Sequence, residues 1–284
     1  MAIGAQCDPS QDTRNLGLEF FRNAQRYAFT CLLEDPSVDM VRTFLLMAFY
    51  LLGECRRNTA FMYLGIATRA AVTLGLHSPA TYENLANPDN RLRLRVWMSL
   101  HILDKLANAI LGRPAATAGI RTDLSHPINM LFSTTERGAV VALASSYHIV
   151  SIIHHIVDTI YDKKVVTIAA VEQILEEIEH WSHQVPESFR SPPNSETAAS
   201  YNNQDDSNHN AIGKIHVSCL YYFAVTLATR PVLVSTITSQ PEAPPEQPQV
   251  ALSSSCLDAA MFLIQTCVEA QKAGLLYHNM CILK

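Results

Sequence analysis

Apolar residues recur at intervals of three and four along nearly every segment of this sequence, whereas extended alternation of apolar and polar residues is hard to find. This spacing places apolar side chains on one face of an α-helix. The pattern predicts an all-α protein, built as an irregular multi-helix bundle or solenoid of antiparallel helices. The Leu-Gly pairs that begin at positions 52, 64, 74 and 111 are irregularly spaced, which argues against a regular helical repeat.

Capping residues and helix breakers set the ends of the first two predicted helices. Asp12 is expected to cap a helix over residues 12–34, which Pro36 ends. Ser37 is expected to cap the next helix, whose apolar stripe begins at Val38. The predicted buried face of the first helix consists of Leu16, Phe20, Ala24, Tyr27 and Cys31.

The same signals place the later helices. Gly75 is expected to adopt the left-handed conformation that ends a third helix, which begins near Asn58. Asn87 followed by Pro88 is a favoured start for a helix, and this fourth helix is expected to continue to residue 112. Further helices are predicted over residues 134–161, 167–184, 212–229 and 252–276.

Two stretches interrupt the helical pattern of what we expect to be a single domain over residues 1–284. Residues 190–211 are rich in Ser, Asn, Asp and Pro, and they are predicted to form a polar insert. Residues 240–250 contain four prolines and are predicted to form an extended linker. Both are expected to be mobile, because neither has the apolar content to offset the entropy of being ordered.

The charge balance restricts the class of partner. The chain has 21 Lys and Arg against 26 Asp and Glu, a formal net charge of -5. Direct DNA binding by this segment is not expected, because a nucleic-acid surface needs excess cations to displace counterions from phosphates. The longest uninterrupted apolar run, Phe44 to Leu52, is shorter than the roughly 20 residues that span a bilayer, so no membrane partner is expected.

The seven cysteines lie at positions 7, 31, 55, 219, 256, 267 and 281. The nearest two, Cys256 and Cys267, are eleven residues apart, whereas structural zinc sites begin from close pairs such as C-x-x-C. Their mostly apolar surroundings are typical of buried thiols. The sequence therefore predicts no zinc cluster and no metal cofactor in this chain.

Motifs for catalysis and metal binding are equally scarce. Two glycines are never closer than Gly112 and Gly119, which excludes nucleophile elbows and phosphate-binding loops, so no enzyme is expected. One group of polar side chains recurs at helical spacings: His148, His154, His155 and Asp158. Without a thiolate pair or an H-E-x-x-H arrangement, we interpret this group as polar positions of an amphipathic helix rather than a metal site.

Several motifs, in a fixed order, resemble the fungal-specific transcription factor domain. The first is R-R-N-T-A-F-M-Y-L-G-I-A-T-R-A-A-V-T-L-G-L-H at residues 56–77. It is followed by an arginine- and leucine-rich segment at 91–97, L-G-R-P at 111–114, and a helix that ends in T-R-P at 229–231. The residues that carry the resemblance are Tyr63, Gly65, Arg69, Gly75, Leu76, His77, Arg95, Trp97, Asp104, Gly112, Arg113, Pro114, Arg230 and Pro231.

The resemblance implies the regulatory middle region of a fungal zinc-cluster transcription factor, located in the nucleus. In that family an N-terminal binuclear zinc cluster with six cysteines binds DNA, so zinc and DNA binding are implied for the family and not for this chain. The implied partners are proteins of the transcription machinery, a second copy of the chain, or a small-molecule effector. Two alternatives stay open: a helical protein-interaction scaffold without a transcriptional role, and a truncated or fragmentary gene product.

Arg69 and Asp104 are the one long-range pair that the sequence suggests. Arg69 is the only charged residue between Arg57 and Glu83, in a helix that is otherwise apolar on nearly all sides. A buried guanidinium needs a partner, because an unpaired one costs several kcal/mol. The only acidic residue inside the fourth helix is Asp104, which predicts a buried ion pair; an anion-binding role for Arg69 is the alternative.

Overall fold

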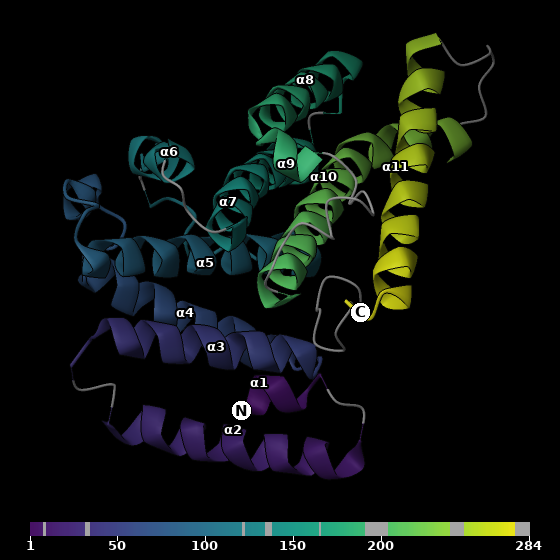
Figure 1. Cartoon of the computed structure of the whole chain (residues 1–284). Coiled ribbons are helices and arrows are strands. Elements are labelled where there is room, and N and C mark those ends of the chain that lie inside the picture. Colours follow the sequence, from purple (N-terminus) through teal and green to yellow (C-terminus); the bar gives the residue numbers. More distant parts are fainter. Residues whose placement is uncertain are drawn as a thin grey trace. The chain divides into compact units, whose positions relative to one another are not determined.

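The computed structural model describes residues 1–7, 10–31, 35–120, 123–133, 138–164, 166–190, 204–238 and 247–275. Every regular element in these ranges is a helix, which confirms the all-α prediction (Figure 1). The described residues divide into two compact units, one that ends at residue 133 and one of residues 138–275. That residues 1–284 fold as a single domain stays a prediction.

The first unit contains the helices α1 to α6. Its elements are α1 (Ala2–Ala5), α2 (Gln11–Cys31), α3 (Val38–Gly53), α4 (Arg57–Thr73), the short 3-10 helix η1 (Pro79–Tyr82), α5 (Pro88–Leu111) and α6 (Ser125–Ser133). In Figure 1, α2, α3, α4 and α5 are stacked as successive layers. The short helix α6 was not predicted, because its nine residues are too few to establish an apolar period.

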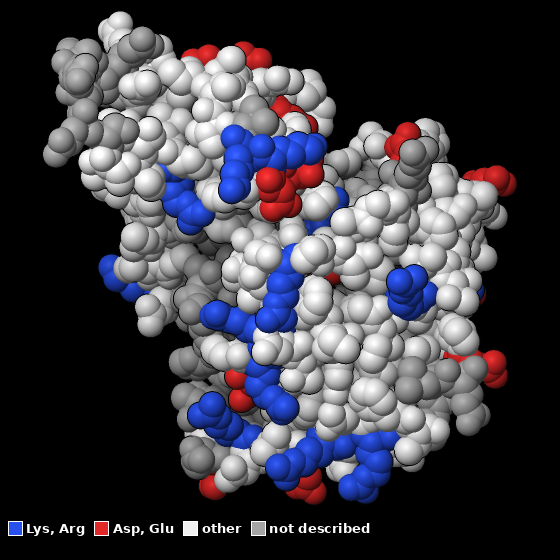
Figure 2. All heavy atoms as spheres, turned by 180° about the vertical axis from the view of Figure 1, so that it is seen from behind, with Lys and Arg blue, Asp and Glu red and all other residues white. Residues whose placement is uncertain are grey.

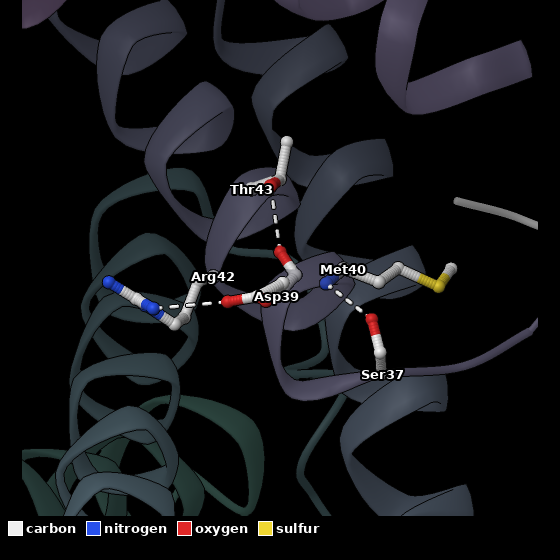
Figure 3. A network of polar contacts seen from close by, with 5 residues as sticks. All are labelled: Ser37, Asp39, Met40, Arg42 and Thr43. Atoms are coloured by element: carbon white, nitrogen blue, oxygen red, sulfur yellow. Dashed lines mark hydrogen bonds and ion pairs between the residues drawn. The ribbon is translucent and has the colours of Figure 1, made fainter. Parts of the chain in front are cut away.

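Local hydrogen bonds explain the helix ends that were predicted correctly. Ser37 caps α3, since its hydroxyl accepts from the Met40 backbone N–H at 3.1 Å (Figure 3). In the same turn Arg42 donates to Asp39 at 3.0 Å, and the Thr43 hydroxyl donates to the Asp39 carbonyl at 2.7 Å. This first turn therefore satisfies its own polar groups without long-range contacts.

The other predicted helix ends of the first unit are also found. Asn87 caps α5 by accepting from the Asp89 N–H at 2.9 Å, with Pro88 as the first helical residue. Gly75 follows α4 with φ +70°, and Gly112 follows α5 with φ +63°. Both glycines occupy the left-handed region, where a side chain would be strained.

The start and the buried face of α2 differ from the prediction. The Ser10 hydroxyl, not Asp12, accepts from the first turn, at 3.4 Å from the Thr13 N–H. The helix buries Phe21 and Ala28 instead of the predicted stripe, of which Leu16 is 49% and Tyr27 73% exposed. The two faces are both apolar, so the packing partner decides which one is buried: Phe21 stacks on Tyr50 of α3 with ring centroids 4.5 Å apart.

The second unit contains α7 (Gly138–Ile156), a π-helical segment η2 (Val157–Asp162), α8 (Ile168–Gln184), α9 (Glu187–Arg190), α10 (Gln204–Thr238) and α11 (Gln247–Lys272). In Figure 1, α10 lies between α7 and α11. Thr167 caps α8 by accepting from the Ala170 N–H at 3.2 Å, so the predicted helix over residues 167–184 is confirmed.

Two predicted boundaries of the second unit are wrong. The predicted helix over residues 212–229 is the middle of α10, which begins at Gln204 and continues through Pro231 to Thr238. The predicted linker over residues 240–250 overlaps α11, which begins at Gln247 with Pro248 in its first turn, where proline is tolerated. Residues 191–203 of the predicted insert and 239–246 of the linker region lie outside the described residues.

Three helical stretches of the second unit are long and apolar enough to cross a membrane, judged by length and composition: Gly138–Asp162, Asn210–Thr238 and Gln247–Lys272. Polar residues interrupt the apolar ones in these stretches, so none of them contains a long uninterrupted apolar run. Within the fold, 67% of the apolar window of the first stretch is buried, but only 22% of that in Gln247–Lys272. The absence of a membrane partner therefore stays a prediction.

Candidate functional site

The signature residues of α4 have three different surroundings. Tyr63 is buried, and its hydroxyl lies 2.6 Å from the amide nitrogen of Gln25, while its ring packs edge to face against Phe44 at 5.7 Å between centroids. Gly65 is partly exposed, and a Cβ placed there would meet nothing within 4 Å. Arg69 is exposed. Of the three, Tyr63 stabilises the core.

The predicted ion pair between Arg69 and Asp104 is wrong. Asp104 is only 1% exposed, and its carboxylate accepts from the Ala116 N–H at 3.0 Å, the Thr117 N–H at 2.7 Å and the Thr117 hydroxyl at 2.8 Å. Arg69 points to solvent and needs no buried partner. The inference failed because it assumed that a charge in an apolar-looking helix is buried, whereas α4 leaves one face open.

Asp104 therefore holds the loop that follows α5. Hydrogen bonds from backbone N–H groups to a buried carboxylate are charge-assisted and stronger than neutral ones. Burial lowers the pKa of the neighbouring Lys105 to about 8, and the charge of Asp104 opposes that shift. The L-G-R-P signature thus precedes a turn that is fastened back onto its own helix.

Arg113 fastens the same segment to α4. Its guanidinium donates to the side chain of Asn58 at 2.6 Å and lies over the Phe61 ring, 5.4 Å from the centroid. The Asn108 side-chain amide donates to the Arg113 carbonyl. Pro114 is exposed. Arg113 and Asp104 together give the signature after α5 a structural role.

The L-G-L-H signature packs against η1 and against α5 at Trp97. Leu76 is fully buried, and its carbonyl accepts from the Tyr82 hydroxyl. The ring of His77 lies 6.3 Å from that of Trp97, which is also fully buried. Arg95, two residues before Trp97, is partly exposed. These residues close the space between η1 and α5.

The T-R-P signature lies inside α10 rather than at its end. Pro231 has no N–H, so the carbonyl of Leu227, four residues earlier, loses its helical donor. The Tyr161 hydroxyl of η2 replaces that donor at 2.9 Å, and the Arg230 guanidinium lies over the Tyr161 ring at 5.2 Å from its centroid. The π-helical turn that carries Tyr161 explains how α10 continues through a proline.

Four aromatic rings form a row across the second unit. Trp181 of α8 stacks on Tyr221 of α10 at 6.3 Å between centroids, and Tyr221 contacts the ring of Tyr222 at 5.3 Å. Tyr222 stacks on Phe262 of α11 at 5.6 Å with an interplanar angle of 24°. We call this set of Trp181, Tyr221, Tyr222 and Phe262 the aromatic row. It connects three helices that are far apart in sequence.

The aromatic row lines two adjoining hollows, which share Ser182, Tyr221 and Tyr222 and which we call the aromatic groove. The smaller hollow, of about 250 Å³, lies beside Trp181. The larger, of about 480 Å³, lies between α8, α10 and α11 and reaches Phe262. The volume of the larger hollow by itself falls in the range of small-molecule sites, about 300 to 1,000 Å³.

Apart from the two tyrosines, the ionisable side chains that line the larger hollow are two carboxylates and one histidine. They are Glu179, His183 and Asp258. Glu179 Oε1 lies 3.9 Å from His183 Nε2. The pKa of Tyr221 is raised by burial, by Tyr222 and by the Glu179 carboxylate, so the field of this carboxylate reaches the aromatic row. This site could not be predicted from the sequence, because its residues come from three separate segments. The adjacent Tyr221 and Tyr222 were the only sign of the site in the sequence.

The four polar side chains near the end of α7 are engaged in other contacts. His155 Nδ1 lies 3.0 Å from Glu177 Oε2, and Lys163 donates to Asp158 at 2.6 Å. The hydrogen bond from Lys163 holds the pKa of Asp158 below its usual value. Burial lowers the pKa of His148. Among the described residues, no group of three or more His, Cys, Asp or Glu is arranged to hold a metal ion.

The described cysteines do not fit a zinc cluster. Cys219 and Cys256 are buried, as predicted, but Cys55 is exposed, so the prediction of buried thiols is wrong there. Cys256 Sγ lies 3.9 Å from the carbonyl of Thr226. Burial raises the pKa of the Cys219 thiol to about 12, and the neighbouring Cys267 thiol adds to this effect. Such thiols are poor metal ligands, because a ligand thiol must ionise.

Acidic side chains occur among the basic ones on the face drawn in Figure 2, where Asp or Glu lie close to several of the Lys and Arg side chains. A DNA-binding surface usually gathers Lys and Arg without interspersed carboxylates.

Comparison with known protein families matches the first part of the chain. The family described as the fungal specific transcription factor domain matches residues 1–164, which is more than half of the chain. This span includes the signature residues of α4 and α5 and ends just after η2. No solved structure gives a significant match.

The curated relatives are described as transcription regulators. An uncharacterized transcriptional regulatory protein of Schizosaccharomyces pombe is 24% identical over 255 residues, which cover 88% of this chain and 31% of that protein. The transcription regulator galc of Aspergillus niger is 31% identical over 28% of this chain and 10% of its own length. The lactose regulatory protein of Kluyveromyces lactis is 27% identical over 40% of this chain and 13% of its own length. The chain thus spans less than a third of each of these relatives.

Proposed function

Because this chain belongs to the fungal-specific transcription factor domain family, we propose that it regulates transcription by responding to a small-molecule effector or a partner protein. The observation that carries the proposal is the family match over residues 1–164. The descriptions of the relatives as transcription regulators support it. A nuclear location and contact with proteins of the transcription machinery, or with a second copy of the chain, are parts of the same proposal.

The internal contacts of the signature residues support a division of labour within the chain. Tyr63, Asp104 and Arg113 bond to neighbouring helices and loops, so they maintain the first unit rather than face a ligand. The aromatic groove of the second unit, by contrast, is open and lined by rings and carboxylates. We assign effector or partner contact to this groove and stability to the signature.

DNA binding is not part of the role proposed for these residues. The described thiols do not fit a zinc cluster, and the formal net charge of the chain is -5. Recruitment to DNA therefore requires a zinc cluster outside these residues or a DNA-binding partner.

A reporter assay tests the proposal. Residues 1–284 are fused to an unrelated DNA-binding domain in a fungal cell that carries a reporter with sites for that domain. We expect reporter output that differs from that of the DNA-binding domain without the fusion, because the chain then brings its regulatory contacts to the promoter. Glu179→Gln in the groove should alter this output, whereas Glu172→Gln, an exposed carboxylate of α8 that does not line the groove, should not.

One result contradicts the proposal directly: a fusion that is stable and nuclear but leaves the reporter at the level of the DNA-binding domain. If such a fusion still captured specific proteins, the helical interaction scaffold without a transcriptional role would replace it.

A further inference from the structure

The aromatic row offers a surface for a positively charged group. Aromatic rings carry negative charge on their faces, and a cation within about 6 Å of a ring centroid is attracted to it. Tyr222 and Phe262 both line the larger hollow, and Phe262 is 51% exposed. One face of Phe262 stacks on Tyr222, and a ligand can reach the exposed part of Phe262 without any rearrangement of the helices.

The charges around the groove favour the same sign of ligand. Glu179 and Asp258 line the larger hollow from α8 and α11, and both are exposed. No Lys or Arg lines either hollow in the described part of the chain. An anionic ligand would face two carboxylates without a counter-charge, which disfavours it. A neutral ligand would pack against the rings but would make no charge interaction with the carboxylates.

The shape of the groove sets the size of the ligand. The smaller hollow, beside Trp181, is lined mainly by apolar and aromatic side chains, including Val185 and Val217. The two hollows, of about 250 and 480 Å³, are neighbours, since Tyr221 and Tyr222 line both. A flat apolar body can lie in the smaller hollow while a charged head lies in the larger one.

We propose that the aromatic groove binds a small organic cation with a flat apolar body, whose charged head lies among Glu179, Asp258 and the rings of Tyr222 and Phe262. The inference rests on the proposed function and deepens it, because it names the chemical class of the effector. The rings and the carboxylates act together: the rings attract the head through their π-electrons, and the carboxylates compensate its charge.

Binding to the purified chain of residues 1–284 tests this inference without any reporter. The probe is benzyltrimethylammonium, and two compounds of similar size serve as comparators, the neutral 3-phenylpropanol and the anionic 3-phenylpropanoate. Titration calorimetry should give a dissociation constant on the order of 0.1 to 1 mM for the cation, since cation–π contacts at accessible sites are modest. The neutral compound should bind roughly 10-fold more weakly, and the anion should bind more weakly still.

Tryptophan fluorescence locates the probe. The chain has two tryptophans, Trp97, which is fully buried in the first unit, and Trp181, which lines the groove. The cation should change the fluorescence of the wild-type chain, and Trp181→Phe should remove that change. A fluorescence change that persists in Trp181→Phe would place the probe elsewhere and overturn the inference.

Three variants test the two parts of the site, the carboxylates and the aromatic rings. Glu179→Gln and Asp258→Asn should each weaken cation binding about 3-fold and leave 3-phenylpropanol unaffected, because exposed charges contribute modestly. Phe262→Leu should weaken the cation about 5-fold, because it removes a ring but keeps an apolar side chain. The matched control Glu172→Gln should leave all three compounds unchanged.

Three results would each overturn the inference. Equal affinities for the cation, the neutral compound and the anion would mean that charge plays no part. Cation binding that is undetectable at about 10 mM would reduce the aromatic row to helix packing, and cation binding that is unchanged in Glu179→Gln would mean that the carboxylate does not contact the charged head. Both variants at the carboxylates replace exposed side chains, so loss of folding does not confuse the result. A negative reporter assay with positive cation binding would refute the transcriptional role and leave the cation site standing.

Discussion

Replacing Asp104 by Asn should destabilise the first unit more than any other single charge-removing change at its surface or in its core. The carboxylate is 1% exposed and accepts three hydrogen bonds from Ala116 and Thr117. Asparagine keeps one oxygen acceptor, which can serve both Thr117 donors, but turns an NH₂ group toward the Ala116 N–H. The substitution therefore removes charge-assisted bonds and adds repulsion between donors.

The magnitude follows from the number of bonds lost. A hydrogen bond to a charged group contributes about 1.5 to 3 kcal/mol. An Asn oxygen in the place of Oδ2 can still accept from the Thr117 N–H and hydroxyl, but as neutral bonds of about 0.5 to 1.5 kcal/mol each, and the bond from the Ala116 N–H is lost. The expected decrease in the free energy of unfolding is about 3 to 5 kcal/mol. Opening of the loop to water lowers this value toward the smaller figure. Thr117→Val, which removes one hydroxyl donor, should cost about 1 kcal/mol.

Urea unfolding followed by Trp97 fluorescence measures the effect in the first unit. A Trp181→Phe background removes the tryptophan of the second unit, so Trp97 is then the only one in the chain. Hydrogen exchange gives a local readout, because the amides of Ala116 and Thr117 should exchange faster in Asp104→Asn. The control is Glu83→Gln, an exposed carboxylate of the same unit, which should change stability by less than about 0.5 kcal/mol.

A double-mutant cycle distinguishes the bonds from Asp104 to the loop after α5 from an ion pair between Asp104 and Arg69. Asp104→Asn and Thr117→Val should couple, because each removes part of the same interaction, whereas Asp104→Asn and Arg69→Gln should be additive within about 0.5 kcal/mol. A loss of less than 1 kcal/mol in Asp104→Asn, or strong coupling to Arg69, would refute the reasoning.

The remaining predictions use other parts of the chain. Gly65→Ala should raise stability by about 0.5 to 1 kcal/mol in thermal unfolding, because the site has room for a Cβ; Gly213→Ala should lower it by about 1 to 3 kcal/mol, because the added Cβ would lie 2.9 Å from a Cβ of α7. Tyr161→Phe should cost about 1 to 3 kcal/mol by leaving a carbonyl of α10 without its donor, and Pro231→Ala in that background should restore part of the loss by supplying an N–H. Burial lowers the pKa of His216 from 6.5 to about 4, so the unfolded chain binds a proton at a higher pH than the folded chain. In urea unfolding at a series of pH values, the free energy of unfolding should be unaffected above about pH 7 and should fall by at most about 3 kcal/mol between pH 6.5 and 4. His216→Gln should remove this loss. The purified chain should show no sequence-dependent binding to duplex DNA, and nanomolar binding in a mobility-shift assay would contradict this.

Features that depend on a few neighbouring residues could be read from the sequence. Ser37 and Asn87 cap helices through bonds to residues two or three positions away, and Gly75 ends a helix through its own backbone conformation. Such interactions are complete within one turn, so they do not depend on what packs nearby. The all-α class follows for the same reason, because the three- and four-residue period repeats in nearly every segment.

Contacts between distant segments were decided by the tertiary structure. In the first unit Phe21 is buried whereas Leu16 is exposed, and Asp104 bonds to the loop after α5 instead of to Arg69. In both cases the sequence allowed more than one solution of similar local energy, and packing selected one.

The proline in α10 and the aromatic groove show most clearly that contacts between distant segments cannot be predicted from the sequence. Pro231 predicted a helix end, since it removes a local hydrogen bond, but the Tyr161 hydroxyl, from a segment some 66 residues away, replaces that bond. The aromatic row joins Trp181, Tyr221 and Phe262, whose spacing in the sequence carries no period. The sequence determined which helices can form and where most of them begin; the tertiary structure decided which side chains meet, because only packing brings distant donors, rings and charges within contact distance.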